Sequence, residues 1–116
     1  MDQRLSTFET LRRREHGLRL SVLRQRLPEA LGGVECSVYL FGSLARGDWD
    51  GFSDTDLLVV AASRELAEQA AERLERARVG DDVLALDHDH WQAMDHSPSP
   101  HWRSIRAQAL RLFPAP

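Results

Sequence analysis

The sequence predicts an α/β (α+β) domain in which helices pack on a small mixed β-sheet. Two observations lead to this prediction. Short apolar runs typical of strands alternate with longer segments of helical periodicity, and 116 residues suit one domain with a single modest core. We therefore expect one domain over residues 1–116, with an N-terminal helix at about 7–27 and a core at about 34–113.

Helices are predicted in three longer segments and two short ones, after Gly42-Ser43 and around Trp91. The first helix follows a capping-box spacing, Ser6 with Glu9, and is expected to end at Pro28. A short helix is expected after Gly42-Ser43. The remaining helices are predicted from a Ser63 cap to about Ala77, around Trp91 after an Asp87 cap, and over His101–Leu112 after Ser99-Pro100.

Three strands are predicted between these helices. They cover Val34–Phe41, Thr55–Ala61 and Val83–Leu86. The second is apolar on both faces, which indicates a central strand. Gly32-Gly33 marks the turn that leads into the first strand.

Composition excludes several classes of function. The net charge of −3 gives no global basic field, so nucleic acid is not an expected partner, and we interpret the Arg12-Arg13-Arg14 run as a solvated helix face. All 15 basic residues are Arg, which excludes mechanisms that need a lysine. The single cysteine, Cys36, fits a reducing compartment. With no apolar segment of membrane-span length and no signal peptide, we expect a cytoplasmic protein that does not contact a membrane.

Two carboxylates stand at the start of the second strand. Asp54 and Asp56 are two residues apart, so in a strand they project to the same side, where like charges repel. A bound Mg²⁺ would remove this repulsion, because Mg²⁺ prefers oxygen ligands and leaves room for phosphate oxygens. An alternative is that Asp54, next to Ser53, is only a turn residue. That alternative does not explain Asp56, which directly precedes a buried run.

A Gly-Ser pair ends the first strand. Gly42-Ser43 followed by a helix would present free backbone N–H groups to an anion such as phosphate, and Arg46 would add a guanidinium. The alternative is a plain turn between a strand and a helix. A Walker A loop is excluded, because Asp48-Trp49 follow Gly47 where Lys-Ser/Thr is required.

The joint motif "GSLARGDWDGFSDTDLLVV" resembles the signature of the DNA polymerase β-type nucleotidyltransferases, and most closely the minimal nucleotidyltransferases. The later segment "DDVLALDHDHW" matches the family's third acidic position, with Asp82 in that place, and "SPSPHWRSIRAQALRLF" resembles its closing helix. The resemblance covers about residues 34–113. It implies a polymerase β-like fold.

The resemblance also implies roles for the motif residues. Gly42 and Ser43 would hold the triphosphate of ATP or another NTP, with Arg46 and Ser53 also in the nucleotide-binding set. Asp54 and Asp56 would hold Mg²⁺, and Asp82 would complete the metal site and activate an attacking hydroxyl. From the residues alone, Asp81 and Asp87 stay open as the third carboxylate, because a shift of one residue turns a side chain to the opposite face.

Two functions follow from the resemblance. The first is a Mg²⁺-dependent nucleotidyltransferase that moves an NMP, expected to be AMP, from an NTP to a hydroxyl acceptor. The second is an antitoxin-type module that neutralises a HEPN-like helical partner with little or no catalysis. The first helix carries much apolar surface for so small a domain, so we also expect packing against a partner or in a homodimer. The acceptor stays open between a partner's hydroxyl, an RNA end and a small molecule.

Other residues attract attention but are not assigned to the reaction. His88, His90 and His96 suggest a transition-metal site, yet His88 and His90 are two apart and would not face together on a helix. For Trp49 and Phe52 we prefer a hydrophobic latch over stacking on a base. Trp91 and Trp102 are expected in the core.

Overall fold

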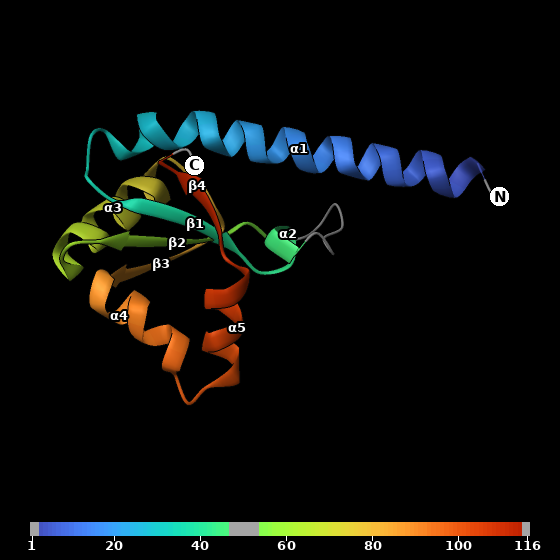
Figure 1. Cartoon of the computed structure of the whole chain (residues 1–116). Coiled ribbons are helices and arrows are strands. Elements are labelled where there is room, and N and C mark those ends of the chain that lie inside the picture. The colour runs from blue at the N-terminus through green and yellow to red at the C-terminus, as the bar shows by residue number, and fades with distance from the viewer. Residues whose placement is uncertain (1–2, 47–53, 115–116) are drawn as a thin grey trace.

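The computed structural model describes residues 3–46 and 54–114, which form a four-stranded mixed sheet with helices on both faces (Figure 1). The strand order is β3-β2-β1-β4; β1 is antiparallel to β2 and β4, and β2 is parallel to β3. The strands are β1 (Ser37–Phe41), β2 (Asp56–Ala61), β3 (Asp82–Asp87) and β4 (Leu110–Phe113). The helices are α1 (Gln3–Leu31), α2 (Ser43–Arg46), α3 (Arg64–Arg76), α4 (His88–Ala93), the 3₁₀ helix η1 (Met94–His96) and α5 (Pro100–Gln108).

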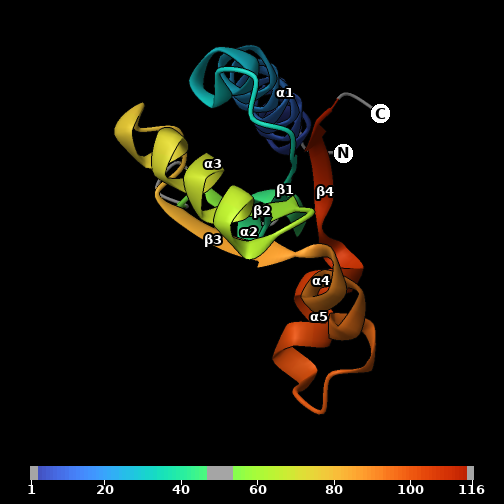
Figure 2. The ribbon, with the colours of Figure 1, turned by 90° about the vertical axis from the view of Figure 1, so that its left-hand side faces the viewer.

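The sheet separates two layers of helices. Figure 2 shows α1 and α3 on one face and α4 and α5 on the other. Along β2, Leu57 and Val59 belong to the core on the α1–α3 side, whereas Leu58 and Val60 belong to the core on the α4–α5 side. All four are at most 1% exposed. The prediction of a central strand buried on both faces is confirmed.

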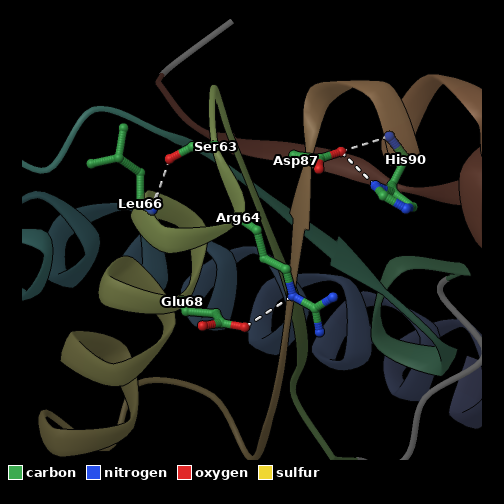
Figure 3. Close-up of polar contacts among 6 residues, drawn as sticks. All are labelled: Ser63, Arg64, Leu66, Glu68, Asp87 and His90. Carbon is green, nitrogen blue, oxygen red and sulfur yellow. Dashed lines mark hydrogen bonds and ion pairs between the residues drawn. The ribbon is translucent and has the colours of Figure 1, made fainter.

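Three of the predicted helix caps, Ser63, Asp87 and Ser99, are present and explain where their helices begin. The Ser63 hydroxyl accepts a hydrogen bond from the Leu66 N–H at 3.2 Å, and the Asp87 carboxylate accepts one from the His90 N–H at 2.8 Å (Figure 3). Ser99 caps α5, with Pro100 in its first turn. Each cap satisfies a backbone N–H that has no partner within its helix.

The first helix differs from its predicted bounds. α1 begins at Gln3, so Ser6 lies inside the helix, and it continues past Pro28 to Leu31. Proline removes only its own N–H, and the Gly32 N–H still donates to the Pro28 carbonyl at 3.2 Å. Leu27 and Leu31 are 0% and 1% exposed, and their burial holds the last turn in place. Within the described residues no helix is both long and apolar enough to cross a membrane.

The C-terminal segment also differs from the prediction. The helix expected to reach Leu112 ends at Gln108, and the residues after it form β4, which pairs with β1. Leu112 is 2% exposed in this pairing. These residues form a strand instead of a helix, because pairing with β1 covers the edge of that strand and also buries Leu112. Of the two tryptophans expected in the core, Trp91 is buried, but Trp102 is 39% exposed, so that expectation is wrong.

Candidate active site

Three adjacent strands bring the motif residues into one row. Phe41, the last residue of β1, pairs with Asp56, the first residue of β2. Asp56 pairs in turn with Asp82, the first residue of β3. The Gly-Ser turn, the motif carboxylate and the later carboxylate therefore meet at one end of the sheet, although 26 residues separate Asp56 from Asp82 along the chain.

Gly42 lies directly against the carboxylate of Asp56. Its φ is +78°, in the region that favours glycine, and a Cβ built on it would lie 2.5 Å from Oδ2 of Asp56. Any other residue at this position would have to displace the carboxylate. Glycine thus serves both the turn and the close approach of the Asp56 side chain to the backbone.

The short helix α2 begins at the residue after this contact. The Arg46 N–H donates to the Gly42 carbonyl at 3.1 Å, which closes the single turn. Arg46 is exposed at the C-terminal end of α2. Ser43 is the first residue of the helix. Three residues considered in the sequence, Ser53, Trp49 and Phe52, lie outside the described part of the chain.

Thr55, between the two motif carboxylates, is hydrogen-bonded both to α1 and to Asp81, the residue before β3. Its N–H donates to the Asp81 carboxylate at 2.7 Å, and its carbonyl accepts from the Asp81 N–H at 2.8 Å. The Thr55 hydroxyl accepts a hydrogen bond from the Arg19 guanidinium of α1 at 3.2 Å. Thr55 is 7% exposed. The roles of Thr55 and Arg19 were not predicted from the sequence, in which the one available signal was a polar residue at the start of an apolar run.

The strand register distinguishes Asp82 from Asp81 as the candidate third carboxylate. Register partners on neighbouring strands project to the same face, so Asp82 shares the face of Asp56. Asp81 is the neighbouring residue, and its carboxylate is engaged by the Thr55 N–H. The geometry therefore brings Asp82, and not Asp81, into the row with Asp56.

Asp87 lies at the opposite end of β3. It pairs with Ala61, five residues along the register from Asp56, which corresponds to about 16 Å along a strand. There it caps α4, and its Oδ1 lies 2.7 Å from the ring Nδ1 of His90 (Figure 3). Hydrogen bonds from the backbone and side chain of His90 lower the pKa of Asp87. Asp87 is therefore a helix cap remote from the row.

Burial and, after it, neighbouring carboxylates disfavour the charged form of Asp56. Its pKa is raised above the ordinary value of 3.8, first by desolvation through burial and then by the charges of Asp82, Asp54 and Asp81. Asp54, Asp81 and Asp82 are exposed, whereas Asp56 is partly buried. A cation bound beside Asp56 would offset both causes of the shift.

This donor set fits Mg²⁺ bound together with a nucleotide. Within residues 3–46 and 54–114, no three His, Cys, Asp or Glu side chains converge on one point as a protein-only metal site requires. Mg²⁺ rarely needs such a cage, because it usually takes one or two carboxylates, several waters and substrate phosphates. Asp56, with Asp54 and Asp82 close enough to raise its pKa, matches that requirement.

A Gly-Ser turn aligned with two register-paired aspartates is an arrangement that can hold a nucleotide phosphate together with a divalent cation. The model of the nucleotidyltransferase domain family matches residues 20–99, and the chain belongs to this family. The matched range includes every site residue predicted from the sequence. No curated protein and no solved structure matches the chain. Nucleotidyl transfer is the general chemistry of the family, whose members generally use a divalent metal with an NTP.

Proposed function

We propose that this protein transfers AMP from ATP to an acceptor hydroxyl in a Mg²⁺-dependent reaction that releases pyrophosphate. The supporting observation is the contact of Gly42 with the Asp56 carboxylate, in a row that continues to Asp82. With Gly42 and Ser43 as the phosphate-binding turn, this row would bring the triphosphate beside the carboxylates that a nucleotide-bound cation needs. The proposal names ATP because the resemblance to minimal nucleotidyltransferases favours it.

Each residue has a defined task in this proposal. Asp54, Asp56 and Asp82 would hold Mg²⁺, which supplies charge neutralisation at the triphosphate when bound. The backbone at Gly42 and Ser43 holds the triphosphate. Arg46, exposed at the end of α2, neutralises charge on the leaving pyrophosphate.

The chemistry is an in-line displacement at the α-phosphorus. The oxygen of the acceptor hydroxyl forms a bond to the α-phosphorus, and the bond from that phosphorus to the oxygen bridging to the β-phosphate breaks. The electron pair of the broken bond leaves with pyrophosphate. Asp82 would take the proton of the hydroxyl, because it lies on the Asp56 face of the sheet and is exposed.

The reaction is tested by label transfer. ATP labelled at the α-phosphate should pass its label to the acceptor, and ATP labelled at the γ-phosphate should not. Asp82→Asn should lower turnover by about 10²-fold or more while ATP binding is largely kept. Asp87→Asn is the matched control: it removes a carboxylate from the same strand, keeps a capping residue at α4, and should leave turnover unchanged. Transfer only from the γ position would identify a kinase and refute the proposal.

A binding function is the second candidate, and one observation favours it. Leu11, Leu18 and Val22 of α1 are 49%, 60% and 50% exposed, so α1 presents several large apolar side chains to solvent. Exposed apolar surface of this kind often marks a site of protein–protein interaction. An antitoxin-type module that neutralises a HEPN-like helical partner would use such a surface. Asp56→Asn separates the two functions: neutralisation of the partner's activity by this variant would show that binding suffices, and its loss would show that transfer is required.

A further inference from the structure

A largely apolar pocket lies on the α4–α5 side of the sheet, apart from the row of motif residues. Figure 1 shows α4 and α5 on this side, joined by a loop. The pocket has a volume of about 580 Å³, within the range of about 300–1,000 Å³ that is typical of sites for small molecules. Five of its eight lining residues are apolar: Leu86, Ala93, Met94, Pro98 and Trp102.

The wall that the loop forms is held in place by hydrogen bonds around Ser97. The Ser97 N–H donates to the Met94 carbonyl at 3.3 Å, and the Ser97 carbonyl accepts from the Arg103 guanidinium at 2.6 Å. The Ser97 hydroxyl accepts a hydrogen bond from the Ser99 N–H at 3.2 Å. Pro98, between the two serines, has a fixed φ. The wall is therefore ordered before any ligand arrives, which lowers the entropic cost of binding.

Trp102 and Met94 favour an aromatic ligand. Trp102 lines the pocket and is 39% exposed, so a flat ring can stack on its indole. Met94 is 7% exposed, and a thioether makes favourable contacts with aromatic rings. An aliphatic molecule of the same size would bury a similar apolar area but would gain neither contact.

His90 provides a hydrogen-bond acceptor at the pocket. Its Nδ1 lies 2.7 Å from Oδ1 of Asp87 (Figure 3). In the neutral ring, an Nδ1–H that donates to this carboxylate leaves Nε2 as an acceptor, to which a ligand hydroxyl can donate. Residues 87–96 contain Asp87, Asp89 and Asp95 but no arginine, so their charges disfavour an anionic ligand. A neutral hydroxyl group is therefore the polar group that suits this pocket.

Two other kinds of ligand, a transition metal and a nucleobase, fit this pocket less well. His90 and His96 both line it, but His88 lines a different pocket. Within residues 3–46 and 54–114, no three His, Cys, Asp or Glu side chains converge as a metal ion requires. A nucleobase has several donors and acceptors along its edge, and a mainly apolar lining would leave most of them unpaired.

We propose that this pocket binds a neutral, flat aromatic molecule that carries a hydroxyl group. The rings stack on Trp102 and contact Met94, and the hydroxyl donates to Nε2 of His90. The pocket is separate from the motif residues, because Leu86 lies four residues from Asp82 on the same face of β3, about 13 Å along the strand. Binding therefore needs neither Mg²⁺ nor a nucleotide, and it does not depend on the proposed transfer.

The test is a calorimetric titration without Mg²⁺ or nucleotide, with β-naphthol as the probe. A molecule of this size is expected to bind with a Kd of about 1 mM or tighter. Three matched compounds each change one property: the methyl ether lacks the donor, β-naphthoate is anionic, and the fully saturated alcohol lacks the aromatic rings. Each should bind at least about fivefold more weakly, and adenosine should not compete with the probe.

Variants of two exposed lining residues locate the probe. Trp102→Ala should weaken binding of β-naphthol by about tenfold or more, whereas Trp102→Phe should keep most of the affinity because it retains an aromatic ring. His90→Phe removes the acceptor but keeps a flat side chain, so it should weaken binding of β-naphthol by at least about fivefold and leave binding of the methyl ether unchanged. Leu18→Ala, at an exposed side chain of α1 outside the pocket, is the control and should bind as the wild type does. Thermal melts check that each variant folds.

Several results would overturn the proposal. They are no binding of β-naphthol up to its solubility limit, equal binding of the saturated alcohol or the methyl ether, displacement of the probe by adenosine, and full binding by Trp102→Ala. The proposed reaction is tested separately by label transfer from ATP. A protein that binds β-naphthol as described but transfers no label would refute the reaction and support the pocket.

Discussion

Replacing Gly42 with alanine tests whether its contact with Asp56 matters for function. The φ of +78° disfavours any L-residue, at about 1–2 kcal/mol. A Cβ would also lie 2.5 Å from Oδ2 of Asp56, whereas ordinary contact begins at 3.4 Å. The carboxylate must therefore move by roughly 0.9 Å, which is possible because Oδ2 is the end of a rotatable side chain. The steric clash should therefore add little to the loss of stability, but it should displace the Asp56 carboxylate from the position proposed for holding the cation.

The expected result is a modest loss of stability and a severe loss of function. Gly42→Ala should lower the melting temperature by roughly 4–8 °C, as 1–2 kcal/mol does in a domain of this size. A misplacement of about 1 Å in a catalytic group costs up to about 10²-fold in rate. Thermal melts with and without Mg²⁺ and ATP, together with label transfer, measure both quantities.

Gly33→Ala is the matched control. Gly33 has a φ of +89° and nothing within 4 Å of its built Cβ, so the variant has the same kind of backbone strain without the carboxylate contact. The two variants should lose similar stability, but only Gly42→Ala should lose the thermal shift produced by Mg²⁺ and ATP. Normal binding and turnover by Gly42→Ala would refute the view that this contact sets the position of Asp56.

Two further predictions concern stability. The pKa of Asp56 is raised in the folded state, so the folded state binds its proton more tightly than the unfolded chain does, and Asp56 lowers stability as pH rises from about 4 through the raised pKa. At neutral pH, Asp56→Asn should therefore melt higher than the wild type without ligand yet lose most of the shift produced by Mg²⁺ and ATP; a lower melting temperature without ligand would contradict the repulsion described above. Leu27→Ala, at a side chain that is 0% exposed, should lower the free energy of unfolding in urea by about 2–5 kcal/mol, whereas Leu18→Ala, at 60% exposure, should change it by no more than about 0.5 kcal/mol; equal losses would show that Leu18 is packed as tightly as Leu27.

Local chemistry made much of the fold predictable. Ser63 and Asp87 cap helices through backbone contacts three residues away, so their signal lies within a few residues of sequence. The central position of β2 follows from a run that is apolar at every position from Leu57 to Ala61. The predictions were wrong where contacts between residues far apart in the sequence determine the secondary structure. Leu31 is buried by tertiary packing that carries α1 past Pro28, and β4 exists because β1 offers an edge to pair with.

In the candidate site, too, local features were predictable from the sequence and long-range contacts were not. The motif predicted which residue types meet, namely Gly42 with Asp56 and a later carboxylate. The choice between Asp81 and Asp82 depends on strand register, which a single sequence does not determine. Thr55 and Arg19 were not foreseen, because their hydrogen bond joins α1 to the start of β2 across 36 residues.

The position of β3 at the edge of the sheet has a consequence for aggregation. The sheet of the described residues ends at β3, an apolar run that carries one aspartate at each end, Asp82 and Asp87. Charges on an edge strand hinder it from pairing with the edge of another molecule. Asp82 thus protects the edge in addition to its proposed role in the reaction. A neutral variant made to test the chemistry also removes half of this protection, so the activity of Asp82→Asn has to be compared with the wild type on samples of the same oligomeric state.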